Sequence, residues 1–472
     1  MKRSGQTSLI RFISLALGTT ALTGLLAFSP ASAETLTDAL AAAYQTNPTL
    51  QAQRAQLRAT DEGVPQALSG WRPSLQAQGS YGATSSTTTF DVAGSLFSAS
   101  SVLTANLRPV NGAVRLSENI FAGGRTVNAT DQAEATVQAG RETLLSVEQT
   151  TLLNAVQAYM GVIGDASVVE LNRSNVEVLK RQLEATTDRF RVGELTRTDT
   201  AQSEARLSLA RTNLTLAEAQ LTASRSFYER IVGQLPGTLE RPAAVSGLPA
   251  TEEEAREIAA RNNPTLLAAR HAEEASREAI SVAKGALLPS LDLQARYQYG
   301  RNVSSTVLNS EESSVLGVLT IPLYQSGTEY SAVRQAKEQN NQSRLEIMAA
   351  MRQVDESVRN AWEILRASRA AITSTREQVN ASSVALEGVR QESEVGARTT
   401  LDVLNAEQES LNARVTLVGA ERDLAVAEYG LLAAIGKLTA RNLQLPVEYY
   451  DPTENYDEVR NKWIGFGTAG DE

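Results

Sequence analysis

One stretch of the chain carries the hydrophobic spacing of a very long helix. Residues 125–191 contain no proline, and apolar side chains recur at heptad positions such as Leu145 and Leu152. At a rise of about 1.5 Å per residue, this stretch predicts a continuous helix of about 100 Å. The chain then turns at residues 192–197 and returns along a second helix that ends near Gly233. The spacing therefore predicts a helical hairpin with coiled-coil packing.

Before this hairpin the hydrophobic period shortens to that of a β-strand. Leu75, Ala77 and Tyr81 alternate with glutamine and serine side chains, so one face of the strand is apolar and the other is polar. A polar stretch at 85–89 follows, and a second strand completes a region of about 73–121. The alternation predicts a pair of strands that belongs to a sheet with one apolar face.

The whole order of elements occurs twice. Residues 47–50 (Asn-Pro-Thr-Leu) recur at 263–266, a shift of 216. Each copy is predicted to begin a helix, because asparagine caps helices and proline fits the first helical position. Residues 192–193 recur at 395–396, a shift of only 203. The second copy therefore lacks 13 residues, and the loss falls within 82–123, where we expect a loop tip.

These observations divide the chain into two repeats and two terminal segments. Each repeat is predicted to contain two strands, a long helix, a tip turn and a return helix. The predicted divisions are a signal peptide at 1–33; a first repeat at 34–240, with strands at about 73–121, a long helix at about 125–191, a tip turn at 192–197 and a return helix to about 233; a second repeat at 241–440, with strands at about 289–324, a long helix at about 328–394, a tip turn at 395–400 and a return helix to about 436; and a C-terminal tail at 441–472.

The first 33 residues have the three parts of a secretory signal peptide. Three basic residues lie among the first eleven, residues 12–28 are uncharged and largely apolar, and Ala31-Ser32-Ala33 is a cleavage site of small residues. The alternative is a retained transmembrane anchor, but glycine and proline in and after the apolar run favour cleavage. No later stretch has about 18 consecutive apolar residues, so no membrane-spanning helix is expected after this segment.

Composition narrows the chemistry that is available to the chain. The 472 residues include no cysteine and one histidine, His271, and the net charge is −10. The absence of cysteine excludes disulfides and thiolate metal sites, and a single histidine leaves almost no material for a histidine metal site or a histidine-based triad. The acidic balance argues against nucleic-acid binding. The sequence also contains no glycine-rich phosphate loop and no nucleophile–base pair. It therefore predicts neither an enzyme nor a cofactor or metal site.

Four amphipathic strands per chain, two in each repeat, cannot close a barrel. A sheet that faces lipid needs both edges paired, and the smallest membrane barrels have about 8 strands. The chain must therefore oligomerise; three copies give about 12 strands, whereas two give a barrel too narrow to conduct much. We predict a mixed α/β membrane protein, in which a trimeric β-barrel with four strands per chain is continued by a long α-helical coiled-coil barrel.

Both tip turns have the same chemistry. Each contains a glycine, which tolerates the left-handed backbone conformation of a tight turn. Each is followed by Thr-x-x-Asp, the pattern of a capping box at the start of a helix. The residues are Gly193, Thr196 and Asp199 in the first tip, and Gly396, Thr399 and Asp402 in the second. We expect the aspartates to cap helices, and a second role for Asp402 as a pore charge stays open beside this one.

The ordered set of features resembles the TolC-like outer-membrane efflux and type I secretion channel proteins. The most specific stretch is 395–406 (Val-Gly-Ala-Arg-Thr-Thr-Leu-Asp-Val-Leu-Asn-Ala), and the segment 443–452 (Leu-Gln-Leu-Pro-Val-Glu-Tyr-Tyr-Asp-Pro) looks like the type I secretion branch. The resemblance covers residues 34–460. It implies a homotrimeric exit duct in the cell outer membrane that extends into the periplasm. The implied partners are a periplasmic adaptor (membrane fusion) protein and an inner-membrane ABC or proton-driven transporter, and the implied cargo is secreted proteins, drugs or other small molecules.

The resemblance also implies roles for individual tip residues. Asp402 matches the first acidic residue of a closed periplasmic constriction, and Asn405 stands where the family has the second. Half of the expected carboxylates would then be missing. Arg398 and Asp199 match positions that latch the coiled coil shut, while Ser393 replaces a tyrosine. Adaptor docking is implied for the two tips as a whole, including Gly193, Gly396, Thr196 and Thr399.

Two other kinds of function compete with the duct. A periplasmic adaptor protein of the helical-hairpin type would have one hairpin flanked by compact β modules, rather than two copies with amphipathic strand pairs. An enzyme on a helical scaffold would need a constellation of reactive side chains. Cell fractionation separates these possibilities, because only the duct predicts a detergent-resistant trimer in the outer membrane.

Overall fold

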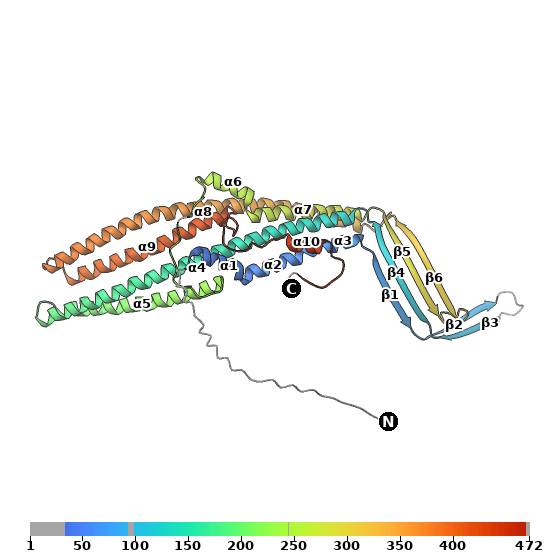
Figure 1. Cartoon of the computed structure of the whole chain (residues 1–472), viewed down its shortest axis with the longest axis horizontal. Helices are drawn as coiled ribbons and strands as arrows, with labels where there is room; N and C mark the ends of the chain where they lie inside the picture. The colour runs from blue at the N-terminus through green and yellow to red at the C-terminus, as the bar shows by residue number, and fades with distance from the viewer. Residues whose placement is uncertain (1–33, 93–98, 244, 469–472) are drawn as a thin grey trace, which may run out of the picture.

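Two long helical hairpins and a β-sheet build an elongated molecule with the sheet at one end and the hairpin tips at the other (Figure 1). This computed structural model describes residues 34–92, 99–243 and 245–468, so the predicted signal peptide at 1–33 lies outside the described residues. The elements in chain order are α1 (Leu36–Thr46), α2 (Pro48–Asp61), α3 (Gly63–Leu68), the 3-10 turn η1 (Ser69–Trp71), β1 (Ser74–Tyr81), β2 (Thr84–Val92), β3 (Ala99–Leu107), β4 (Val110–Phe121), α4 (Arg125–Arg191), α5 (Arg197–Val232), α6 (Glu252–Asn262), α7 (Pro264–Gly285), β5 (Ser290–Arg301), β6 (Asn309–Thr320), α8 (Thr328–Glu394), α9 (Thr400–Ala434) and α10 (Glu454–Arg460).

The helices α4 and α8 each run for 67 residues, over the ranges that the sequence predicted. The helix α5 lies along the half of α4 near the tip, and α2 and α7 lie along the half near the sheet (Figure 1). Among the described helices, α4 contains a window apolar enough to cross a membrane, but half of that window is buried in the fold. Burial against other helices explains its apolar character, because a helix in the core of a bundle is hydrophobic on several faces.

The asparagine–proline pairs begin helices as expected. The Asn47 carboxamide oxygen accepts a hydrogen bond from the Thr49 backbone N–H at 3.0 Å, and Asn263 accepts one from Thr265 at the same distance. Each side chain also donates across the fold, Asn47 to the Ile231 carbonyl and Asn263 to the Ala434 carbonyl, both at 2.9 Å. The caps therefore tie the start of α2 and α7 to the ends of the return helices α5 and α9.

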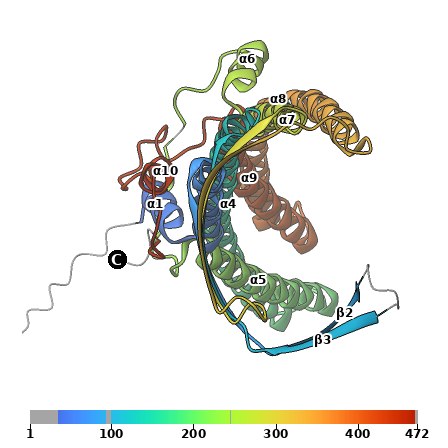
Figure 2. The same cartoon turned by 90° about the vertical axis from the view of Figure 1, so that its right-hand side faces the viewer.

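Four strands form one antiparallel sheet in the order β1-β4-β5-β6. The pairs Leu75↔Leu116 and Leu116↔Ala295 place apolar residues of neighbouring strands on one face. This face is open, because the side chains of Leu75 and Val315 are 70% and 72% exposed. Seen along the long axis, the sheet is an arc (Figure 2). Within the part of the chain that the structure describes, the edge strands β1 and β6 each pair with one strand.

The first repeat contains two more strands than the sequence predicted. Residues 85–89, expected to be a polar connection, lie inside β2, which pairs with β3 in a separate two-stranded sheet. The ladder of β1 and β4 ends at Tyr81↔Val110, and the Gly82 N–H donates to the Pro109 carbonyl at 3.2 Å where the chain bends. The hairpin β2–β3 projects beyond the four-stranded sheet (Figure 1). The 13 residues missing from the second repeat lie in the region that this hairpin occupies.

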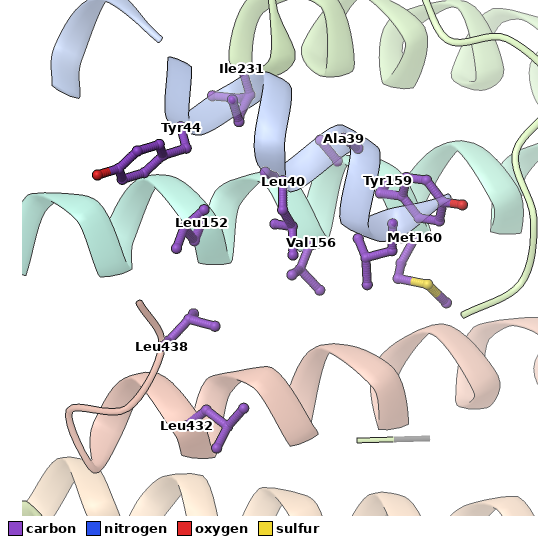
Figure 3. Close-up of a cluster of buried hydrophobic side chains, with 14 of the residues drawn as sticks. Ala39, Leu40, Tyr44, Leu152, Val156, Tyr159, Met160, Ile231, Leu432 and Leu438 are labelled. Atoms are coloured by element: carbon purple, nitrogen blue, oxygen red, sulfur yellow. The ribbon is translucent and has the colours of Figure 1, made fainter. Parts of the chain in front are cut away.

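The main hydrophobic core lies midway along the helices, where α1, α4, α5, α8 and α9 meet. Figure 3 shows Leu40, Leu152 and Val156 from α1 and α4 among its members. The buried Tyr159 hydroxyl lies between the carbonyls of Glu34 and Glu240, at 2.8 and 2.6 Å, and its single proton is shared between these two acceptors. Burial raises the pKa of Tyr159 to about 12, so the hydroxyl keeps its proton and serves as a donor. This tyrosine fixes the first described residue of the chain to the segment that joins the two repeats.

The C-terminal helix α10 closes over α2 and α4 through polar contacts. The Asn455 amide donates to the buried Asp61 carboxylate at 2.8 Å, and the Tyr456 hydroxyl donates to Glu134 at 3.1 Å. The second oxygen of Asp61 has no hydrogen-bond partner. The predicted tail at 441–472 is therefore an ordered strap over its described part, and it holds one carboxylate in an unfavourable environment.

Candidate functional site

The two hairpin tips have nearly the same backbone geometry. Gly193 and Gly396 have φ angles of 82° and 78°, in the left-handed region that a residue with a β-carbon rarely adopts. Just after the glycine in each tip, a backbone N–H closes the turn. Glu194 donates to the Arg189 carbonyl at 2.9 Å, and Ala397 donates to the Glu392 carbonyl at 2.8 Å. The duplicated sequence motif thus produces two equivalent ends.

Both predicted capping boxes are present. The Asp402 carboxylate accepts hydrogen bonds from the Thr399 backbone N–H and hydroxyl at 3.0 and 2.8 Å, and the Asp402 N–H donates to the Thr399 hydroxyl at 3.2 Å. Thr196 and Asp199 make the same contacts in the first tip. These bonds hold the pKa of both aspartates below the ordinary value, because they favour the charged form. Each tip therefore presents an ionised carboxylate at the start of its return helix.

An ion pair inside each turn reinforces it. The Arg398 guanidinium donates to the Glu392 carboxylate at 2.8 Å, and Arg189 donates to Glu194 at 3.1 Å. The sequence indicated Arg398 and Asp199 as latch positions, but within one chain they do not contact each other. Arg398 is bound in its own turn, and Asp199 is bound in its capping box.

The two hairpins are joined just above the tips. The Arg206 guanidinium on α5 donates to the Asn405 carboxamide oxygen on α9 at 2.7 Å. Beside this link, Leu404 packs with Leu179 and Leu207 in a small separate hydrophobic cluster. Asn405 thus links the first repeat to the second, while the Asp402 carboxylate, one turn earlier on α9, is bound only to the start of its own helix.

Sequence reasoning missed the Arg206–Asn405 hydrogen bond and also an ion pair in which the Arg390 guanidinium on α8 donates to Glu407 on α9 at 3.1 Å. No pattern in the neighbouring sequence indicates either contact. The partners of the first lie 199 positions apart, and one charged side chain on a helical surface resembles another until the packing is known. The internal repeat offered one hint, because Asn405 and Arg206 lie on equivalent return helices.

Comparison with known proteins decides the family. The family model described as outer membrane efflux protein matches residues 39–233 and 255–437, and each matched range falls inside one predicted repeat. The chain belongs to the outer membrane efflux protein family. Like other members of this TolC-like family, it is an outer-membrane protein that extends into the periplasm.

Relatives and solved structures agree with this assignment. The chain is 36% identical to the outer membrane efflux protein BepC of Brucella suis over 96% of this chain and 95% of that protein. It is 29% identical to the outer membrane protein TolC of Vibrio cholerae over 92% and 96% of the two chains. The crystal structure of the Campylobacter jejuni CmeC outer membrane channel has the same fold, with a TM-score of 0.75 at 15% identity over 90% of this chain and 89% of that one.

Within the described ranges, no group of three or more metal-binding side chains comes together. The features that the efflux-family fold brings to the tips are instead two ionised carboxylates, two turn-closing ion pairs and the Arg206–Asn405 link. These groups can attract cations and can hold or release the packing of two helical hairpins.

Proposed function

We propose that three copies of this chain form a passive exit duct through the outer membrane. The unpaired edges of the four-stranded sheet support the proposal most strongly. In lipid, an edge strand with free backbone N–H and C=O groups is too costly to persist, so β1 and β6 need partners from other chains.

The direction of the strands fits such a closure. Every pair in the sheet is antiparallel, so β1 and β6 run in opposite directions. The β6 strand of one chain can therefore pair with β1 of the next and continue the antiparallel pattern. Three sheets give about 12 strands, an even number within the range of known outer-membrane barrels.

The helical part then continues the barrel as a tunnel. The helices α4 and α8 each measure about 100 Å, enough to carry cargo well into the periplasm. The cargo would be secreted proteins, drugs or other small molecules. The energy would come from an inner-membrane ABC or proton-driven transporter that meets the duct through a periplasmic adaptor. No step in this account requires catalysis by the chain itself.

The hairpin tips would form the regulated end of the tunnel. Three Asp402 carboxylates near the symmetry axis would repel one another and attract cations, whereas Asn405 adds no charge. The pairs Arg398–Glu392 and Arg206–Asn405 would keep the hairpins packed in the closed state. The tips, with Gly193, Gly396, Thr196, Thr399 and Asp199, would present the surface that the adaptor meets.

Bilayer recording and cell fractionation together test this proposal. We expect the protein in the outer-membrane fraction as a detergent-resistant trimer. We also expect discrete single-channel currents when the purified trimer is added to a planar bilayer. A periplasmic adaptor would instead be released with the periplasmic fraction and give no currents, and that result would contradict the proposal.

A further inference from the structure

Two arginines face each other across the middle of the sheet. Arg115 on β4 and Arg296 on β5 are direct partners in the strand register. They alternate with the apolar residues Val114, Leu116 and Tyr297, so both arginines lie on the polar face. Like charges directly opposite each other destabilise a sheet. Both side chains are exposed, so water can solvate them, and an anion held between them would also relieve the repulsion.

The described part of the chain does not provide that anion. In the described part of the sheet neither guanidinium has an ion pair, and the cross-strand neighbours Gln76 and Ser314 are neutral. Arg296 donates only to the Gln298 carboxamide. Two acidic residues share the polar face but lie at other heights: Asp292 accepts a hydrogen bond from Asn119 at 3.0 Å, and Glu312 pairs with Gln298.

The polar face is the lumen face of the proposed barrel, because the opposite face must meet lipid. Three chains would then carry six guanidiniums at one height, roughly midway along the strands. We propose that Arg115 and Arg296 form an anion-binding band in the barrel lumen that takes carboxylate groups of passing cargo. This inference rests on the proposed trimeric duct. It adds a class of ligand, carboxylate-bearing molecules, at the end opposite to the acidic tips.

Arginine suits this task for a geometric reason. Its planar guanidinium donates two parallel hydrogen bonds to one carboxylate, and charge-assisted bonds of this kind are stronger than neutral ones. In a polar lumen the bonds remain reversible, because water competes for both partners. The band would therefore slow or concentrate anions without trapping them.

Block of single-channel current by citrate, a tricarboxylate, tests the band directly. We expect citrate added on the side of the β2–β3 hairpin to reduce the current of the unaltered protein. The double variant Arg115→Gln and Arg296→Gln should need about tenfold more citrate for the same block, since each lost bidentate pair weakens binding. The control variant Arg261→Gln removes a charge from α6, outside the sheet, and should keep full block.

The outcomes separate the two proposals. If the unaltered protein gives no channels, the duct itself is contradicted. If it conducts but citrate has no effect, or blocks the double variant equally well, the anion band is wrong while the duct stands. A detergent-resistant trimer of the double variant on a gel shows that its loss of block does not come from failed assembly.

Discussion

At the scale of single residues, Asp402 is both a helix cap and an ionised carboxylate. The sequence alone left a helix cap and a pore charge open as its two roles. Its carboxylate caps α9 through Thr399, and the same bonds keep it ionised. A helix cap and a pore charge do not compete here, because the bonds from Thr399 go to one carboxylate oxygen, Oδ2. The other oxygen is free to face a passage.

Replacing Asp402 by Asn separates the charge from the cap, since a carboxamide oxygen can still accept from Thr399. We expect Asp402→Asn to lower the preference for cations and to weaken block by divalent cations several-fold. The lowered pKa means that this charge, and the stability it adds, is present above the ordinary carboxyl pKa and is lost only when pH falls through the lower folded-state value.

Planar-bilayer recordings in calcium chloride measure both effects. The matched variant Asp199→Asn removes the equivalent charge from the first tip and serves as the control. Divalent block that stays the same in Asp402→Asn would contradict a pore-facing role and leave Asp402 as a helix cap only.

Asp61 is one of the buried or half-buried carboxylates, with Glu142 and Glu148, whose ionisation works against the fold. Burial raises its pKa above 3.8, and the Asn455 hydrogen bond only partly offsets this. A raised carboxyl pKa means that the folded state holds the proton more tightly, so stability falls as pH rises through 3.8 towards the folded-state value. We expect Asp61→Asn to remove this dependence and to raise the melting temperature at neutral pH by about 2 °C per kcal/mol gained.

Thermal unfolding of both proteins at acidic and neutral pH provides the measurement. The change in melting temperature between the two conditions should be smaller in Asp61→Asn. An equal change in both proteins would show that the Asp61 carboxylate is not a source of the pH dependence.

At the scale of elements, local sequence signals predicted what local interactions determine. The helix starts at Asn47 and Asn263, the capping boxes and the left-handed tip glycines are all set by neighbours within a few residues. The hairpin β2–β3 was missed because its strand Thr84–Val92 is rich in serine and threonine and has no apolar alternation. Its strand character comes from pairing with β3, which a single-strand pattern cannot reveal.

The sequence could not predict the contacts between elements, because these contacts also depend on partners far away in the chain. Asn405 was expected only to line a constriction, but the structure gives it a partner, Arg206, on the return helix of the other repeat. Which faces of α5 and α9 meet depends on the packing of Leu404 and Leu207, not on either helix alone.

The Arg206–Asn405 link predicts a variant with looser tips. We expect Arg206→Ala to raise the single-channel conductance of the closed duct several-fold, because α9 loses its hydrogen bond to α5 near the tip. Arg211 lies on the same helix and, among the described residues, makes no ion pair; Arg211→Ala removes the same charge, so the conductance should stay unchanged. Equal conductance of Arg206→Ala and the unaltered protein would show that this link does not hold the tips closed.

At the scale of the whole molecule, the decisive feature is a sheet with two unpaired edges at the end of a rod of helices (Figure 1). The chain buries its helical core by itself, but its sheet exposes an apolar face and two edges. Alternation and the repeat predicted four strands per chain, which is the number in this sheet, although they missed the separate two-stranded sheet of β2 and β3. The sheet is an arc (Figure 2), and further copies of the chain can complete this arc to a closed barrel.

Disulfide crosslinking between edge strands tests this completion most directly, because the natural chain has no cysteine to interfere. Cysteine at Gln78 on β1 would be combined in turn with cysteine at Ser310, Glu312 or Ser314 on β6. The account predicts that at least one pair, oxidised in outer membranes, forms a covalent ladder that ends at three chains. If every pair stayed uncrosslinked, or if the purified protein were a stable monomer without affinity for lipid, the account would be contradicted.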